Sequence, residues 1–271
     1  MPFPYKTVLV TGATSGIGQA LVERLLSHGE NIFVIAAGRR QDRLDALLKT
    51  HGPEKIAVEN VDVGDLAGLP AWVDKVTKAH PTLDCVILNA GFQQALNLAD
   101  PKSIDLPSLT DEITVNYLSP AHASNLFLPH FMSLAPKPTA IVFVTSGLAL
   151  VPSSRCPNYC ASKAALHSLA WTLRSQLAAA PATKSVRVIE IIPPAVQTEL
   201  HTRQGLPQIG LPLDQFIDET WAGLTAAEEI DEVMPKILRN MSGHVEDVKR
   251  DSYKKMAALM AAQEAKAKEA H

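Results

Sequence analysis

Cysteine, long apolar runs and an excess of either charge are all scarce in this chain. Its 271 residues include three cysteines, which argues against a disulfide framework and fits a reducing compartment. No segment reaches the roughly 18 uninterrupted apolar residues that a membrane span needs. A net charge of −3 gives no reason to expect nucleic acid or an anionic membrane as a partner. The first residues lack the layout of a signal peptide, so we expect a cytoplasmic protein.

Fixed-period repeats and Gly- or Ser-rich linkers are missing as well. The apolar fraction is 46% and the charged fraction 20%, which is an ordinary globular mixture and excludes disorder of the whole chain. The length suits one large α/β domain. We therefore expect a single domain.

Short apolar runs alternate with helical patterns along most of the chain. Strands are predicted at residues 7–10, 32–37, 56–61, 85–88, 140–145 and 186–192, and helices at 19–27, 42–50, 65–79, 110–134 and 158–180. A glycine cap at Gly29 should end the first helix. Strands without polar alternation are buried on both faces, as in a parallel sheet. The pattern predicts an α/β fold, a Rossmann-type doubly wound parallel sheet with helices on both faces.

Two regions lie outside this alternation. Residues 195–223 carry scattered prolines and glycines and are interpreted as a substrate lid with a short helix near 214–220. The residues from 243 to 271 are helical in composition and form a C-terminal extension. The sequence leaves open whether that extension is docked or frayed.

A glycine-rich turn follows the first predicted strand. Gly12, Gly16 and Gly18 suit a tight turn whose free amides face a pyrophosphate at the start of a helix. Such a turn alone could equally be an ordinary loop, but its place between the first strand and the first helix favours a dinucleotide.

The end of the second strand bears on the choice of cofactor. An NAD site has an acid there for the ribose 2′-hydroxyl, whereas this chain has Gly38 followed by Arg39 and Arg40. Guanidinium groups match a 2′-phosphate in charge and geometry. NADP(H) is therefore predicted in preference to NAD(H); the alternative is a solvated basic start to the next helix.

Tyr159 and Lys163 are four residues apart at the start of a predicted helix, so both lie on one face of it. A nearby ammonium should lower the pKa of the phenol and make it a useful general acid. Ser146 closes the fifth strand at the edge where open α/β sheets hold ligands. Each residue alone could be structural, but together with the nucleotide turn they indicate catalysis.

Asn116 joins this group for a backbone reason. Pro120, four residues later, has no N–H to donate, so the carbonyl of residue 116 loses its intrahelical partner and the helix should kink. The freed carbonyl could hold a water beside Lys163; a simple helix break is the equal alternative.

These motifs, with Asn89-Ala90-Gly91, resemble the short-chain dehydrogenase/reductase family from about residue 7 to 198. The resemblance implies that Tyr159 is the acid/base, that Lys163 holds the nicotinamide ribose and lowers the tyrosine pKa, that Ser146 orients the substrate, and that Asn116 anchors a relay water. The implied cofactor contacts are Thr11, Gly12, Thr14, Ser15, Gly16, Ile17, Gly18, Arg39, Arg40, Asp62, Val63, Asn89, Ala90, Gly91, Tyr159, Lys163, Pro193, Val196 and Thr198. A homodimer or homotetramer is also implied.

One departure from the family concerns the nicotinamide wall. The family usually has Pro-Gly after the sixth strand, where this chain has Pro193-Pro194. Because Pro194 forbids positive φ, the turn is stiffer, although Thr198 remains available. No metal is predicted, since the histidines are dispersed and Cys156 and Cys160 lack further ligands.

The sequence therefore predicts an NADP(H)-dependent carbonyl reductase or alcohol dehydrogenase. A hydrophobic substrate is suggested by Leu148, Leu200, Leu206, Leu211 and Phe216 near the lid. The alternative is a non-catalytic NADP(H) sensor, which would need the glycines but not the Ser146, Tyr159 and Lys163 set. An epimerase or dehydratase is a weaker third possibility.

Overall fold

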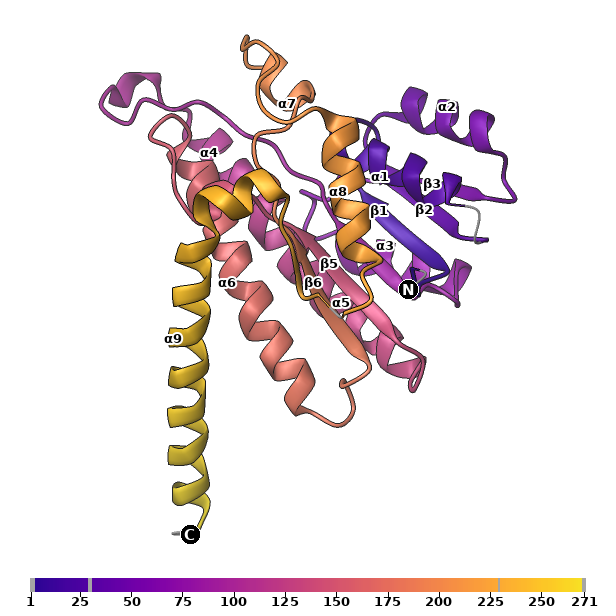
Figure 1. Cartoon of the computed structure of the whole chain (residues 1–271). Coiled ribbons are helices and arrows are strands. Elements are labelled where there is room, and N and C mark those ends of the chain that lie inside the picture. Colours follow the sequence, from indigo (N-terminus) through magenta and orange to yellow (C-terminus); the bar gives the residue numbers. More distant parts are fainter. Residues whose placement is uncertain (1–2, 29–30, 229, 270–271) are drawn as a thin grey trace.

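Seven parallel strands form one sheet at the centre of the computed structural model (Figure 1), in the order β3-β2-β1-β4-β5-β6-β7. The structure describes residues 3–28, 31–228 and 230–269. The strands are β1 (Thr7–Thr11), β2 (Phe33–Gly38), β3 (Ile56–Asn60), β4 (Cys85–Leu88), β5 (Thr139–Val144), β6 (Val186–Ile191) and β7 (Glu232–Val233). The first six match the predicted strands to within about one residue at each end, and the predicted doubly wound fold is confirmed.

The helices flank both faces of this sheet. They are α1 (Gly16–Ser27), α2 (Gln41–His51), α3 (Leu69–Ala79), α4 (Leu106–Ile113), α5 (Ser119–Ser133), α6 (Pro157–Ala179), α7 (Glu199–Thr202), α8 (Leu213–Leu224) and α9 (Lys236–Glu269). Side chains of α1, α2 and α8 fill the core on one face, and side chains of α3, α5 and α6 fill the core on the other. Every residue of β1, β4 and β5 is buried, which explains their unbroken apolar runs.

The helix predicted over residues 110–134 is interrupted. One turn of π-helix, Thr114–Leu118, separates α4 from α5, and Ser119 N donates to Thr114 O five residues earlier. Pro120, which has no N–H, lies directly after this turn. The expected distortion at Asn116 is thus present as a π-turn, a feature often found at functional sites.

The predicted lid, residues 195–223, contains both α7 and α8. α8 packs against α1, and its Phe216 and Trp221 are buried in the core. Residues 195–212, before α8, are therefore loop-like except for the short helix α7. The glycine cap expected at Gly29 lies outside the described residues.

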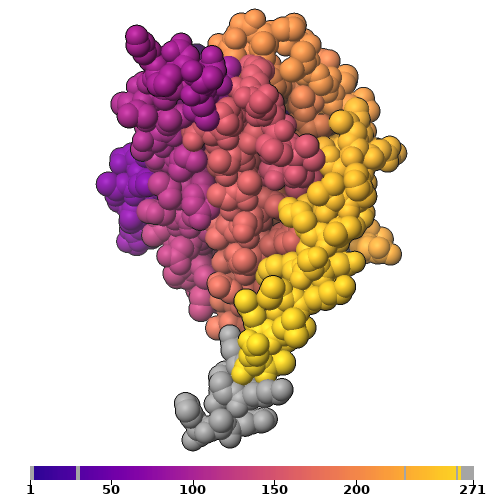
Figure 2. All heavy atoms as spheres, turned by 90° about the vertical axis from the view of Figure 1, so that its left-hand side faces the viewer, coloured from indigo at the N-terminus to yellow at the C-terminus, as the bar shows by residue number. Residues whose placement is uncertain are grey.

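α9 begins docked and then continues past the fold (Figures 1 and 2). Glu246 is buried, and the ring of Tyr253 packs on Trp171 of α6 with centroids 5.3 Å apart. Beyond Tyr253 the described side chains are exposed, and residues 270–271 of the predicted extension lie outside the described residues. Within the described part of the chain, no helix combines the length and apolar character required to cross a membrane.

Candidate active site

The glycine-rich turn between β1 and α1 is built by close backbone approach. Gly12 and Gly16 have φ of 68° and 53°, a region that glycine adopts without steric cost. A Cβ on Gly18 would lie 2.3 Å from the carbonyl oxygen of Gly12 and 2.4 Å from Asn89 Nδ2. The turn therefore requires glycine at these positions, and it leaves the start of α1 open to a phosphate.

A second segment, Asn89-Ala90-Gly91, runs from the glycine turn to the residues around Lys163. Thr11 Oγ1 accepts hydrogen bonds from the backbone N–H groups of Asn89 and Ala90 at 3.0 and 3.1 Å. A Cβ on Gly91 would meet Asn116 Oδ1 at 2.9 Å and Lys163 Nζ at 3.4 Å. The segment thus joins the two halves of the site.

Replacing Gly18 with Ala tests this cradle. The new methyl group would clash with Gly12 O, so we expect a loss of about 1–3 kcal/mol in the free energy of unfolding and a large loss of nucleotide affinity. Chemical denaturation and cofactor titration would measure both. Gly243→Ala is the matched control, because the nearest atom there belongs to the flexible Arg239 side chain. Wild-type nucleotide affinity in Gly18→Ala would contradict the assignment of the turn.

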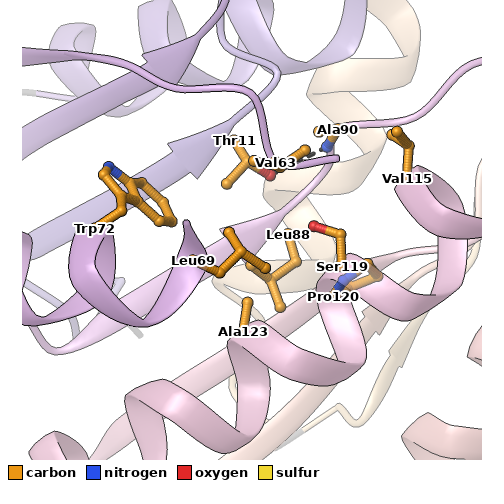
Figure 3. A pocket seen from close by; sticks show the side chains of 10 residues that line it. All are labelled: Thr11, Val63, Leu69, Trp72, Leu88, Ala90, Val115, Ser119, Pro120 and Ala123. Carbon is orange, nitrogen blue, oxygen red and sulfur yellow. Dashed lines mark hydrogen bonds between the residues drawn. The ribbon is translucent and has the colours of Figure 1, made fainter. Parts of the chain in front are cut away.

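A small pocket (Figure 3) is lined by Thr11, Val63 and Ala90 together with residues from α3 and α5. Its volume of about 10 Å³ is no larger than one water molecule. Its lining residues Thr11, Val63 and Ala90 are predicted cofactor contacts. Asp62, another predicted cofactor contact, accepts from Arg39 Nη1 at 3.4 Å.

The two arginines after β2 differ in their surroundings. Arg39 is exposed, with 68% of its side-chain surface accessible. Arg40 instead lies on the glycine turn and donates to Thr14 Oγ1 at 2.8 and 2.9 Å and to Ser15 Oγ at 2.6 Å. The structure thus fixes Arg40 beside the turn more firmly than Arg39.

Ser146, Tyr159 and Lys163 come together at the carboxyl ends of β5 and β6. Ser146 follows β5 and caps a short 3-10 turn, where its Oγ accepts from Leu148 N at 3.1 Å. Lys163 Nζ lies 5.8 Å from the centre of the Tyr159 ring and donates to Val144 O at 2.8 Å. Ser146 also makes a side-chain hydrogen bond with Tyr159.

The ionisation of this group differs from the expectation. Burial raises the pKa of Tyr159 well above its ordinary value, and the hydrogen bond with Ser146 only partly opposes this. Burial also lowers the pKa of Lys163 to about 8, against a raising influence from Glu190. The expectation of a lowered tyrosine pKa is therefore wrong, because loss of hydration dominates when a charged form is buried.

Asn116 is fully buried in the π-turn. Its side chain donates to Phe92 O at 2.9 Å and accepts from Phe92 N at 3.0 Å, and it also donates to Ser162 Oγ at 3.1 Å. These bonds tie the loop after β4 to α6. Asn116 therefore sets the spacing between Gly91 and Lys163 through its side chain.

The segment after β6 closes the other side of the site. Pro193 O accepts from Gly147 N at 2.7 Å, and a Cβ on Gly16 would lie 3.3 Å from Thr198 Cβ. Val196 is buried in the core, so its side chain serves packing. Pro194 does not have a positive φ, because the proline ring fixes φ at a negative value.

Comparison with known proteins decides the family. Residues 6–207 match the family model described as short chain dehydrogenase. The chain is 38% identical over 233 residues to an uncharacterized oxidoreductase, DltE, of Bacillus subtilis, covering 84% of this chain and 88% of that protein. The chain is a short-chain dehydrogenase.

One further relative is an oxidoreductase, and one solved structure has the same fold. The yeast benzil reductase ((S)-benzoin forming) IRC24, from Saccharomyces cerevisiae, is 29% identical over 197 residues, covering 72% of this dehydrogenase and 73% of that enzyme. A short-chain dehydrogenase from Sphingobium yanoikuyae, solved with NADPH, superimposes with a TM-score of 0.77 at 24% identity, covering 92% and 95% of the two chains. The dehydrogenase is accordingly an oxidoreductase that acts on small molecules.

Some of the side chains predicted to line an apolar substrate site are buried in the core instead. Phe216 is fully buried and Leu211 is 8% exposed, and both belong to the core beneath α8. The leucine-rich lid therefore does not by itself indicate a hydrophobic substrate, because part of its apolar content packs the dehydrogenase's own core.

A buried ionic cluster lies directly behind Lys163, and sequence reasoning missed it. Glu190 of β6 accepts from His167 Nδ1 at 2.8 Å and from Thr145 Oγ1 at 2.5 Å. Glu246 of α9 lies 3.0 Å from His167 Nε2. Burial alone would lower the pKa of His167, but the two glutamates outweigh it and raise the pKa to about 9. The i, i+4 spacing of His167 from Lys163 was the one available signal.

Proposed function

We propose that this dehydrogenase interconverts a carbonyl and an alcohol with NADP(H), using Tyr159 as general acid and base. The single observation that supports this most is the cluster of Ser146, Tyr159 and Lys163 at the carboxyl edge of the sheet. It lies beside Gly91, whose neighbour Ala90 packs against Gly12 of the glycine-rich turn. A binding protein would need the cradle but not the phenol.

The glycine-rich turn fits a dinucleotide, because side chains at Gly12 and Gly18 would clash and Gly16 has a positive φ, so the turn leaves the start of α1 open. When bound, the cofactor supplies the hydride in reduction and accepts it in oxidation. In reduction, the Tyr159 hydroxyl gives its proton to the substrate oxygen as the carbonyl carbon gains the hydride. The high pKa of buried Tyr159 keeps that proton in place until substrate charge develops.

Lys163 and Ser146 support the proton transfer. The Lys163 ammonium stabilises the phenolate that remains on Tyr159, and Ser146 holds the substrate oxygen. Lys163 also binds the nicotinamide ribose, and the π-turn at Asn116 carries a water that returns the proton from solvent. In oxidation each proton moves in reverse.

The activity is tested with a panel of ketones and alcohols, which includes benzil because of the yeast relative. We expect NADPH oxidation with at least one ketone. Tight NADPH binding with no turnover across the panel would instead favour the sensor.

The cofactor preference is tested at Arg40. A charge-assisted hydrogen bond contributes about 1.5–3 kcal/mol, so Arg40→Gln should weaken NADPH binding by roughly 10-fold or more and leave NADH binding nearly unchanged. Fluorescence titration measures both. Arg39→Gln is measured in parallel, because Arg39 is the other predicted partner of the 2′-phosphate and lies exposed beside Asp62. Equal affinity of the wild-type chain for NADPH and NADH would overturn the preference.

A further inference from the structure

The first residue of α7 reaches the arginines at the start of α2. Glu199 Oε1 accepts from Arg43 Nη1 at 2.7 Å, and Glu199 Oε2 accepts from Arg40 Nη1 at 3.2 Å. Arg203, one turn later, also donates to this carboxylate. The hydrogen bond from Arg43 holds the pKa of Glu199 below its ordinary value. The Glu199 carboxylate therefore accepts hydrogen bonds from three guanidinium groups.

Arg40 keeps its place without Glu199. Its Nε and Nη2 atoms make three hydrogen bonds to the hydroxyls of Thr14 and Ser15, whereas only Nη1 points to the carboxylate. Arg43 likewise donates to Thr14 O at 3.0 Å. Removing the charge of Glu199 would thus leave both guanidinium groups beside the glycine turn and free their remaining N–H donors.

The segment that carries Glu199 also contacts the glycine-rich turn and the loop before α6. Thr198, the residue before Glu199, packs on Gly16, and Gln204, shortly after it, accepts from Arg155 Nη2 at 2.8 Å. Figure 1 shows α7 at the same end of the molecule as α2 and the start of α1. Glu199 therefore joins the lid to the two arginines.

We propose that Glu199 competes with the 2′-phosphate of the cofactor for Arg40 and Arg43, and so limits the preference for NADP(H) and couples it to the lid. This inference rests on the phosphate site of the proposed function. The carboxylate and the phosphate share the same donors. Coupling between two sites is reciprocal. A phosphate that binds Arg40 and Arg43 therefore weakens their hydrogen bonds to Glu199, and with them the attachment of α7 to the start of α2.

Two nucleotides that differ only in the 2′-phosphate test the competition without turnover. Calorimetric titration of adenosine 2′,5′-bisphosphate into Glu199→Gln should show binding roughly fivefold tighter or more than in wild type. Binding of 5′-AMP should stay within about twofold. Glu219→Gln is the matched control, since this carboxylate on α8 accepts from Gln215 and Lys236 and should change neither affinity.

The outcomes separate this inference from the proposed cofactor. Unchanged or weaker binding of the bisphosphate by Glu199→Gln would overturn the competition, and weaker binding would mean that Glu199 orients the arginines. If wild type shows no preference for the bisphosphate but Glu199→Gln gains one, the competition stands and the NADP(H) preference of the wild type fails. If neither protein prefers the bisphosphate, both proposals fail.

Hydrogen exchange of the wild-type chain tests the coupling to the lid. Amides of residues 199–205 should exchange faster with saturating adenosine 2′,5′-bisphosphate than with saturating 5′-AMP, because the phosphate releases Glu199. In Glu199→Gln the two nucleotides should give the same exchange. Equal exchange in wild type would overturn the coupling.

Discussion

Replacing Tyr159 with Phe should lower kcat for carbonyl reduction by about 10²–10⁴-fold, the usual contribution of a positioned general acid, and leave NADPH binding within about twofold. The change removes one hydroxyl from a side chain that is 7% exposed and keeps the ring that packs near Lys163 and Cys156. The fold should therefore persist while the proton donor is lost. Steady-state kinetics with the best ketone of the panel, and fluorescence titration of NADPH, measure the two quantities.

Tyr253→Phe is the matched control for this substitution. The Tyr253 hydroxyl shares a 2.7 Å hydrogen bond with Ser175 on the outside of α6, so its removal should leave kcat unchanged. A Tyr159→Phe protein with wild-type kcat would exclude the phenol as the acid, whatever the cofactor. A protein that loses NADPH binding as well would show that Tyr159 acts mainly in binding.

The spacing of motifs was enough to place the main parts of the site. Tyr159 and Lys163 share a helix face because they are four residues apart, and Ser146 reaches them because parallel strands end at one edge. The ionisation of Tyr159 was not predictable in the same way. Its pKa depends on burial by residues from other elements, and a sequence motif carries no measure of hydration.

The strands were predictable where the sequence has long runs of apolar residues. β7 was missed because two residues, Glu232 and Val233, are too few to show a period. The docking of α9 was left open because it depends on Glu246 meeting His167 of α6, and nothing local to residue 246 indicates a buried acid. Glu190 was similarly inconspicuous, as a single acid within an apolar run. The contacts of Glu199 were missed because Arg40 and Arg43, at the start of α2, are far from it in the sequence.

Replacing Glu190 with Gln should lower the free energy of unfolding at pH 7 by about 3 kcal/mol or more, since breaking a buried ion pair leaves its partner uncompensated. Glu190 is 0% exposed and His167 is 4% exposed, so water cannot replace the lost carboxylate. Glu59→Gln is the matched control: Glu59 is also a strand glutamate, 8% exposed, but its partner Lys75 has 65% of its side chain accessible. That substitution should cost less than about 1 kcal/mol.

The same cluster predicts how stability depends on pH. The pKa of His167 is raised from 6.5 to about 9, so folding favours its protonated form. This contribution, at most about 3 kcal/mol, is complete below pH 6.5 and is lost as the pH rises through 9. Burial raises the pKa of Glu190 and offsets part of it. His167 also faces Lys249 and Glu246, and the hydrogen bond with His167 holds the pKa of Glu246 below its ordinary value despite burial. The lowered pKa of Lys163, about 8, has the opposite effect, because stability rises as this buried ammonium loses its proton. The test is therefore a comparison of two proteins: between pH 6.5 and 9.5, urea denaturation should show wild type losing more stability, or gaining less, than Glu190→Gln. The same pH dependence in wild type and in Glu190→Gln would mean that Glu190 does not hold His167 as a cation.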